Sequence, residues 1–136
     1  GLHSLEHRQN ARGGKMMDLL VKGLVANGYG IYLTDANKFF IYDHKTTDEF
    51  SDAHIDKYAE IIRQEIEIVK PTVIVCLGRS AERMCKKMGI QNILALPHLS
   101  GTARGAIVRK FPRLGKIGAT AENIAEEYTR EIMESL

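Results

Sequence analysis

The feature that most constrains the fold is a continuous run of apolar, mostly β-branched residues at Thr72–Leu77. Pro71 precedes this run and Gly78 follows it, and both residue types favour a break in regular structure at these points. A strand without an alternating polar face is typical of a parallel sheet that is covered on both sides. The run therefore predicts a buried strand of an α/β fold.

Helix-like and strand-like segments alternate along the rest of the chain. Apolar residues at helical spacing predict helices that begin near Lys15, Asp52, Ser80 and Thr120, and strand-like runs occupy residues 30–34, 72–77 and 93–96. This order predicts a three-layer α/β/α domain with a short parallel sheet. We expect residues 1–14 to be a flexible tail and residues 15–136 to be a single α/β domain. Ligands of such folds bind at the carboxyl ends of strands, which here are residues 35–38 and 97–105.

The cysteine content and the hydropathy pattern exclude several classes of protein. Cys76 and Cys85 lack histidine partners nearby in sequence and do not make a zinc or iron–sulfur ligand set, so we expect buried free thiols, no metal and no cofactor. No apolar stretch approaches the ~20 residues needed to cross a bilayer, and no signal peptide opens the chain. We therefore expect a cytoplasmic protein without a membrane partner.

Charge is distributed unevenly. Eight Lys or Arg residues and no acidic residue lie between Arg83 and Ala121, whereas the rest of the chain has 11 basic and 17 acidic residues. A surface that faces a polyanion would produce this pattern, because basic side chains that contact phosphates release condensed counterions. A solvated basic face without any partner would produce it too.

Three segments, taken in order, resemble the uracil-DNA glycosylase superfamily. They are Ile31–Lys38, Lys70–Gly78 and Leu96–Arg104, and the resemblance extends from about Gly14 to about Pro112. It implies the fold of that superfamily and a DNA glycosylase-like hydrolase that releases uracil or another modified base from DNA in base-excision repair. The four cysteines of the iron–sulfur branch of the superfamily are missing, so no cluster is expected.

The chemistry of this reaction directs attention to the loop after the last predicted strand. A departing base carries negative charge, mostly on its exocyclic oxygen, and a preorganised hydrogen-bond donor aimed at that oxygen is worth ~3 kcal/mol. His98 stands between Pro97 and Gly101, so the loop can present it rigidly as the catalytic donor. The alternative is a loop histidine that satisfies backbone groups.

The resemblance also implies contacts with the base and with DNA. Ser100 would contact the base, and Leu99 would fill the space that the base vacates when it leaves the duplex stack. The predicted DNA-binding residues are Leu99, Gly101, Arg104, Arg109 and Lys110. Gly101 can also serve only to permit a turn, and Arg104 can be an ordinary surface charge.

Asp35 and Asn37 are the predicted base-reading residues on the other strand end. The superfamily typically has an asparagine at the position of Asp35, and an ionised carboxylate can only accept hydrogen bonds. Three alternatives follow: burial keeps Asp35 protonated, the ligand offers more donors than uracil, or base reading is lost. Asn37 points to the same side of an extended segment and could substitute, and Asp35 could instead cap the following turn.

Residues 1–30 contain no counterpart of the strand and loop with which the superfamily opens. Without that strand, two other strands would lack their shared neighbour, and unpaired buried backbone is costly. The chain is then a fragment, or a partner chain supplies the strand, or the fold is rebuilt around three strands. The alternatives to a glycosylase are a non-catalytic module that binds a nucleobase, a nucleotide or DNA, and a flavodoxin-like protein-interaction unit.

Overall fold

The computed structural model describes residues 12–36 and 52–136. These residues fall into two compact units, each of which is described here by itself. The first unit contains the described residues of 1–31 together with 96–136, and the second unit contains those of 32–95. The extent of a single domain over 15–136 stays a prediction, and the first helix begins at Arg12, three residues earlier than expected.

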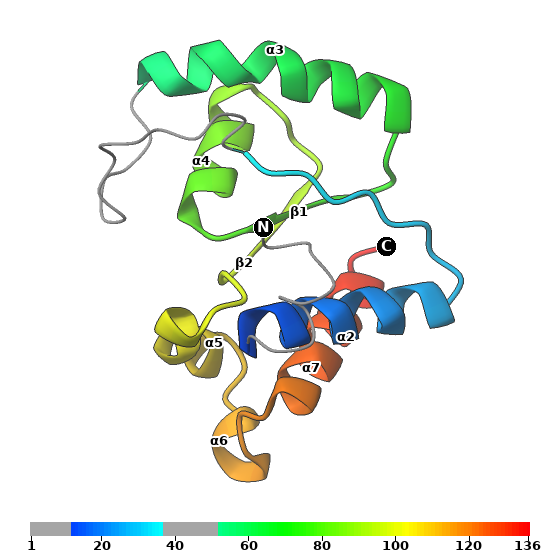
Figure 1. Ribbon diagram of the computed structural model, residues 1–136, viewed down its shortest axis with the longest axis vertical. Coiled ribbons are helices and arrows are strands. Elements are labelled where there is room, and N and C mark those ends of the chain that lie inside the picture. The colour runs from blue at the N-terminus through cyan, green and yellow to red at the C-terminus, as the bar shows by residue number, and fades with distance from the viewer. Residues whose placement is uncertain (1–11, 37–51) are drawn as a thin grey trace. The chain divides into compact units, whose positions relative to one another are not determined.

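Two long helices form the centre of the first unit. Helix α2 (Arg12–Ala26) and helix α7 (Ala121–Glu134) pack side by side, as Figure 1 shows. The predicted apolar stripe of each helix is buried, because a 3.6-residue period places these side chains on one face. The buried stripe residues are Met17, Leu20 and Leu24 of α2 and Ile124, Tyr128 and Ile132 of α7.

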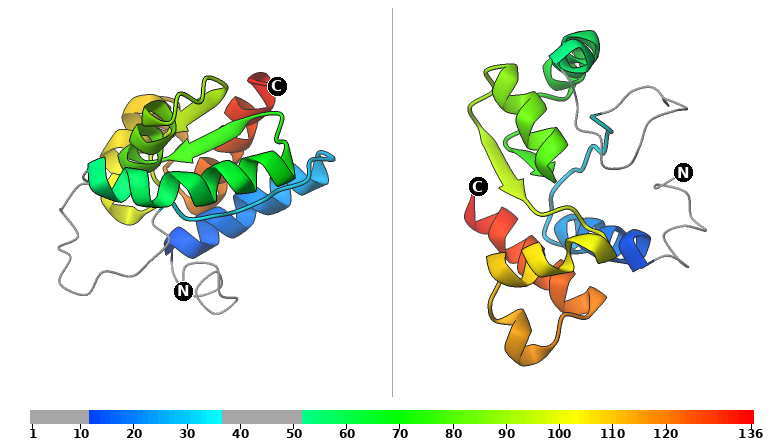
Figure 2. Two further views of the ribbon diagram at one scale, coloured as in Figure 1. Left: turned by 90° about the horizontal axis from the view of Figure 1, so that it is seen from above. Right: turned by 90° about the vertical axis from the view of Figure 1, so that its left-hand side faces the viewer.

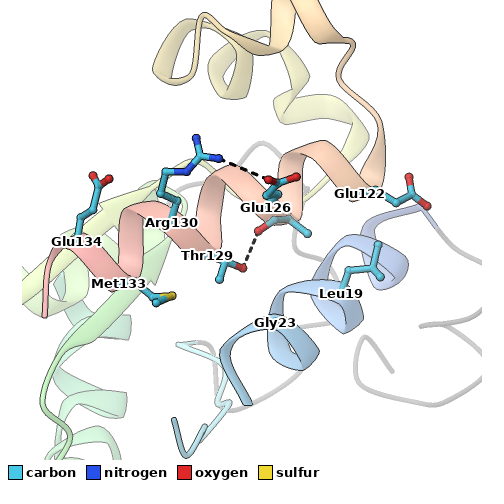
Figure 3. Close-up of a pocket in the computed structure, with 9 residues that line it drawn as sticks. Leu19, Gly23, Glu122, Glu126, Thr129, Arg130, Met133 and Glu134 are labelled. Carbon is cyan, nitrogen blue, oxygen red and sulfur yellow. Dashed lines mark hydrogen bonds and ion pairs between the residues drawn. The ribbon is translucent and has the colours of Figure 1, made fainter. Parts of the chain in front are cut away.

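The two helices are in close contact at Gly23 of α2. A Cβ atom added to Gly23 would lie 2.9 Å from the Thr129 hydroxyl oxygen of α7, so a larger residue would require the Thr129 side chain or the helices to shift. Figure 3 shows Gly23 and Thr129 facing each other across the shallow groove between α2 and α7. The Thr129 hydroxyl donates a hydrogen bond to the Ala125 carbonyl at 2.8 Å within α7. Because α7 packs closely against α2, it can support the other segments of the first unit.

The ends of both helices have local sequence causes. Thr120 caps α7, since its hydroxyl accepts a hydrogen bond from the Asn123 amide at 3.1 Å, as the sequence predicts. At the end of α2, the Asn27 side chain donates to the Gly23 carbonyl at 2.7 Å. Gly28 then adopts a φ of +89°, a left-handed conformation that glycine tolerates without steric cost.

Three short helical segments connect the strand before them to α7. They are the 3-10 helix η1 (Gly101–Ala103), α5 (Arg104–Lys110) and α6 (Leu114–Ile117). Their buried residues include Ile107 and Leu114, and Phe111 between α5 and α6 is also buried. The Phe111 ring packs against the Tyr128 ring of α7 with a centroid separation of 5.3 Å and a tilt of 47°. This segment therefore rests on α7.

The second unit contains the sheet. Strands β1 (Ile74–Leu77) and β2 (Ile93–Leu96) form a short two-stranded parallel sheet, and α4 (Arg79–Lys87) packs against β1. Figure 2 shows α4 beside the two strands, and α3 (Asp52–Val69) contacts α4. Tyr58, Ile62 and Met84 form the core of this unit, with Met88 packed against them. The predicted α/β fold with a short parallel sheet is confirmed.

The third predicted strand, residues 30–34, is wrong. These residues are not paired with a strand in the described part of the chain, and Ile31, Tyr32 and Leu33 are 37%, 55% and 43% exposed. Strand propensity reflects packing in a sheet, so an apolar run without a neighbouring strand does not form one. The segment is held otherwise: the Thr34 hydroxyl donates to Glu65 Oε2 at 3.0 Å, and Ala36 packs against the core of the second unit.

Both cysteines are free and buried, as predicted. A hydrogen bond between the Cys76 and Cys85 side chains raises the pKa of Cys76, and burial acts in the same direction, so this thiol stays protonated. The same hydrogen bond lowers the pKa of Cys85, against the opposing effect of burial. None of the helices in the described ranges is long and apolar enough to cross a membrane.

Candidate active site

His98 lies in the loop that follows β2, and its side chain is exposed. Its two neighbours are not: Pro97 is half-buried and Leu99 is only 3% exposed. The chain therefore turns one polar side chain outward between two residues that face the interior of the first unit. The histidine is thus exposed on a loop whose neighbouring residues are buried or half-buried.

Tyr128 of α7 holds the first of these neighbours. Its hydroxyl donates a hydrogen bond of 2.7 Å to the Pro97 carbonyl oxygen. Tyr128 is fully buried, and burial raises the pKa of its phenol well above the usual range, so the hydroxyl remains a proton donor. The ring of Tyr128 is itself held by the tilted contact with Phe111. The backbone immediately before His98 is thus tied to the long C-terminal helix.

The first turn of α2 lies against the second neighbour. A Cβ atom added to Gly13 would come within 2.9 Å of the Leu99 carbonyl oxygen, a distance that real Cβ atoms essentially never show. Only glycine therefore allows the helix to approach the loop backbone this closely. Helix α2 and helix α7 thus contact the loop on the two sides of His98 in the sequence.

Short hydrogen bonds shape the end of the loop. The Ser100 amide donates to the His98 carbonyl at 3.0 Å, and the Ala103 amide donates to the Ser100 carbonyl at 3.2 Å. The Ser100 and Thr102 hydroxyl oxygens lie 3.1 Å apart, within hydrogen-bond distance. The predicted base contact of Ser100 and the predicted DNA contact of Gly101 stay predictions; a Cβ atom added to Gly101 would meet open space.

Leu99 faces inward in this conformation. At 3% exposure, its side chain belongs to the core of the first unit and is not on the surface. Insertion into a DNA duplex would require this side chain to leave its packing, so the predicted role of Leu99 implies a movement of the loop.

The basic residues that follow the loop differ in whether a carboxylate lies close to them. Lys110 Nζ lies 3.6 Å from Glu131 Oε1, and Arg113 Nη1 lies 3.3 Å from Glu127 Oε1, both carboxylates belonging to α7. In the described part of the chain, no carboxylate lies within ion-pair distance of Arg104 or Arg109, and both are exposed. The two arginines of α5 are therefore exposed positive charges that no described carboxylate compensates.

The other predicted half of the site belongs to the second unit. Asp35 belongs to that unit and is exposed. Asn37 lies outside the described residues. The proximity of these two residues to His98 stays a prediction.

Sequence analysis missed the residues that support the loop. Tyr128 was predicted only as a core residue of the last helix, and its spacing with Ile124 and Ile132 carries no sign of a hydrogen bond to Pro97. Gly13 was assigned to the tail. A glycine near the start of a helix was the single available signal of a close backbone approach.

Comparison with known proteins gives one match. The family model of the uracil-DNA glycosylase superfamily matches residues 5–116, a range that includes the His98 loop and α5 and ends before α7. No curated protein and no solved structure matches the chain. Because the family model covers most of the sequence, the chain belongs to the uracil-DNA glycosylase superfamily.

Proposed function

We propose that this chain is a DNA glycosylase-like hydrolase that releases uracil or another modified base from DNA in base-excision repair. The observation that carries the proposal is the exposed His98, held between two interior-facing neighbours in the region that the family model matches. A surface histidine without a function needs no such support. Exposure combined with a fixed backbone is what a preorganised hydrogen-bond donor requires.

The reaction breaks the bond between the base nitrogen and C1′ of the sugar. The electron pair of this bond stays with the base, water supplies the oxygen that C1′ gains, and the proton of the water ends on the base. Negative charge builds up on the exocyclic oxygen of the base as the bond breaks, and an imidazole N–H of His98 would donate to that oxygen. Loss of one such donor typically costs ~3 kcal/mol, or 10²–10³-fold in rate.

The surface beside His98 supports binding of a polyanion. Arg104 and Arg109 follow the loop on α5 and have no carboxylate within ion-pair distance among the described residues. Each contact between such a side chain and a phosphate releases counterions and makes binding weaker as salt increases. In this proposal, the two arginines hold the DNA backbone while Ser100 contacts the extruded base.

A non-catalytic module that binds a nucleobase, a nucleotide or DNA is the second candidate. Asp35 favours it, because a glycosylase that reads uracil needs a donor for O4 as well as an acceptor for N3–H. An exposed aspartate in place of an amide supplies only acceptors. A ligand with more donor groups than uracil would suit this residue better.

Base release separates the two candidates. We would incubate the wild-type chain and the His98→Ala variant with single- and double-stranded oligonucleotides that contain one uracil, and quantify the free base. The proposal predicts release by the wild type and a loss of 10²–10³-fold in the variant. Equal release by both proteins would remove the catalytic role of His98. Binding that weakens steeply with salt and gives no free base from either protein would select the binding module.

A further inference from the structure

We infer that Tyr128 is a positioning residue for the site: through its hydrogen bond to Pro97 it sets the place of His98 at the surface. This inference rests on the proposed function in so far as it assigns His98 a reaction. It concerns α7, which lies outside the region that the superfamily model matches.

The ring and the hydroxyl of Tyr128 make different contacts. The Tyr128 ring packs in the core of the first unit beside Phe111. Its hydroxyl donates a hydrogen bond to the carbonyl of Pro97, the residue directly before His98. This hydrogen bond is part-buried, and removal of the hydroxyl would leave the Pro97 carbonyl without its side-chain donor. Removal of the hydroxyl would therefore act mainly on the backbone of the loop.

The residues that follow His98 are held by contacts that do not involve Tyr128. Leu99 is fixed by burial and by the contact of its carbonyl with Gly13, and the Ser100 amide bonds to the His98 carbonyl at 3.0 Å. His98 thus has its following residues constrained by α2 and by the turn, and its preceding residue constrained by Tyr128. Without the bond to Pro97, the nearest constraint before the histidine is the buried Leu96 at the end of β2. A donor misplaced by about 1 Å can lose 10²-fold in rate.

Tyr128→Phe removes the hydroxyl and keeps the ring. We expect the rate constant of base release at saturating DNA to fall about tenfold, with the dissociation constant for DNA changed less than twofold. Amide exchange of residues 98–101 should become faster, and the imidazole signals of His98 in the free protein should shift. A merely structural role would lower the thermal midpoint but leave the exchange of the loop and the rate of the folded protein unchanged.

Tyr58→Phe is the matched control. It removes a phenol hydroxyl from a residue that is just as buried, but Tyr58 packs with Ile62 and Met84 in the core of the second unit. This variant should leave the exchange of residues 98–101 and the His98 signals as in the wild type. Gly13→Ala approaches the loop from the α2 side; it should also shift the His98 signals, because its Cβ would displace the Leu99 carbonyl.

The two proposals fail in different ways. Absence of base release by the wild type would contradict the proposed function, and the loop measurements on Tyr128→Phe would still decide the positioning role. Unchanged exchange and unchanged His98 signals in Tyr128→Phe would overturn the inference. In an active protein, a mobilised loop with an unaltered rate of release would overturn it too, because His98 would then not depend on the bond.

Discussion

The loop after β2 and the run of residues that precedes Asp35 differ in how the chain supports them. Residues 97–101 are held by α2 and α7, with Leu99 buried and the Pro97 carbonyl bonded to Tyr128. Residues 31–33 are exposed, and they pair with no strand in the described ranges. Both segments resemble the superfamily in sequence, yet residues 31–33 lack the burial that holds Leu99.

This difference indicates which segment is the better candidate for a catalytic role. A catalytic donor needs a fixed position, and the His98 loop satisfies that condition through contacts made by residues far away in the sequence. Asp35 stands two residues after the exposed run, next to Thr34, which bonds to Glu65, and Ala36, which packs against the core. The end of this segment is therefore placed within its unit, but the run before it is not packed.

The largest expected effect comes from removing the central contact of the first segment. Tyr128→Ala deletes a fully buried ring and its hydrogen bond, so we expect a loss of about 3–5 kcal/mol in the free energy of unfolding. Tyr32→Ala removes an equally large side chain that is 55% exposed, and it should change that free energy by less than ~0.5 kcal/mol. Urea titration of both variants measures the comparison. Equal losses would show that the two segments are supported alike.

DNA binding should distinguish the unpaired from the paired basic residues. Arg104→Ala and Arg109→Ala should each weaken binding severalfold and reduce the slope of log K against log salt by about 0.9. Lys110→Ala should do less than half as much, because Glu131 already lies 3.6 Å from its ammonium group. Fluorescence anisotropy across a salt series gives all three slopes. A larger effect for Lys110 than for both arginines would refute the division of the basic stretch.

A smaller effect is expected for the carboxylate that ties α6 to α7. Glu127 is nearly buried and contacts Arg113 at 3.3 Å and Arg130 at 3.4 Å. Since both arginines are about half-exposed, we expect Glu127→Gln to cost only about 1 kcal/mol in the free energy of unfolding. High salt should reduce the difference between the variant and the wild type. A difference that persists unchanged at high salt would argue against an ionic origin.

The smallest effect concerns the pair that joins the start of α2 to α7. Lys15 Nζ lies 2.9 Å from Glu122 Oε1, and this hydrogen bond lowers the pKa of Glu122 in the folded chain. The pair therefore adds stability at pH values above the ordinary carboxyl range, and this contribution is lost as the pH falls through the lowered pKa. Lys15→Gln should move the pKa of Glu122 back toward its ordinary value, as carboxyl NMR titration would detect. No movement would place the cause elsewhere.

The sequence was sufficient to predict the elements that are specified locally. The helical spacing of Met17, Leu20 and Leu24, the Thr120 cap and the β-branched run of β1 all depend on neighbours in the chain, and the structure confirms them. The strand at residues 30–34 could not be predicted correctly, because a strand requires a partner and composition does not supply one.

The candidate site shows the same division. The family resemblance selected the loop with His98 and the basic residues of α5. It did not reveal that Tyr128 supports Pro97 across 31 residues, or that carboxylates of α7 compensate Lys110 and Arg113. These contacts depend on how α7 packs, which no spacing within the segment of 97–113 can indicate.

The proposed role of His98 in stabilising the departing base can be tested by single-turnover kinetics. Excess wild-type protein, His98→Ala and the surface control Lys22→Gln would each be mixed with a uracil-containing oligonucleotide at saturating concentration. We expect a rate constant 10²–10³-fold lower for His98→Ala, with unchanged DNA affinity, and no change for Lys22→Gln. Base release by His98→Ala at the wild-type rate would contradict it.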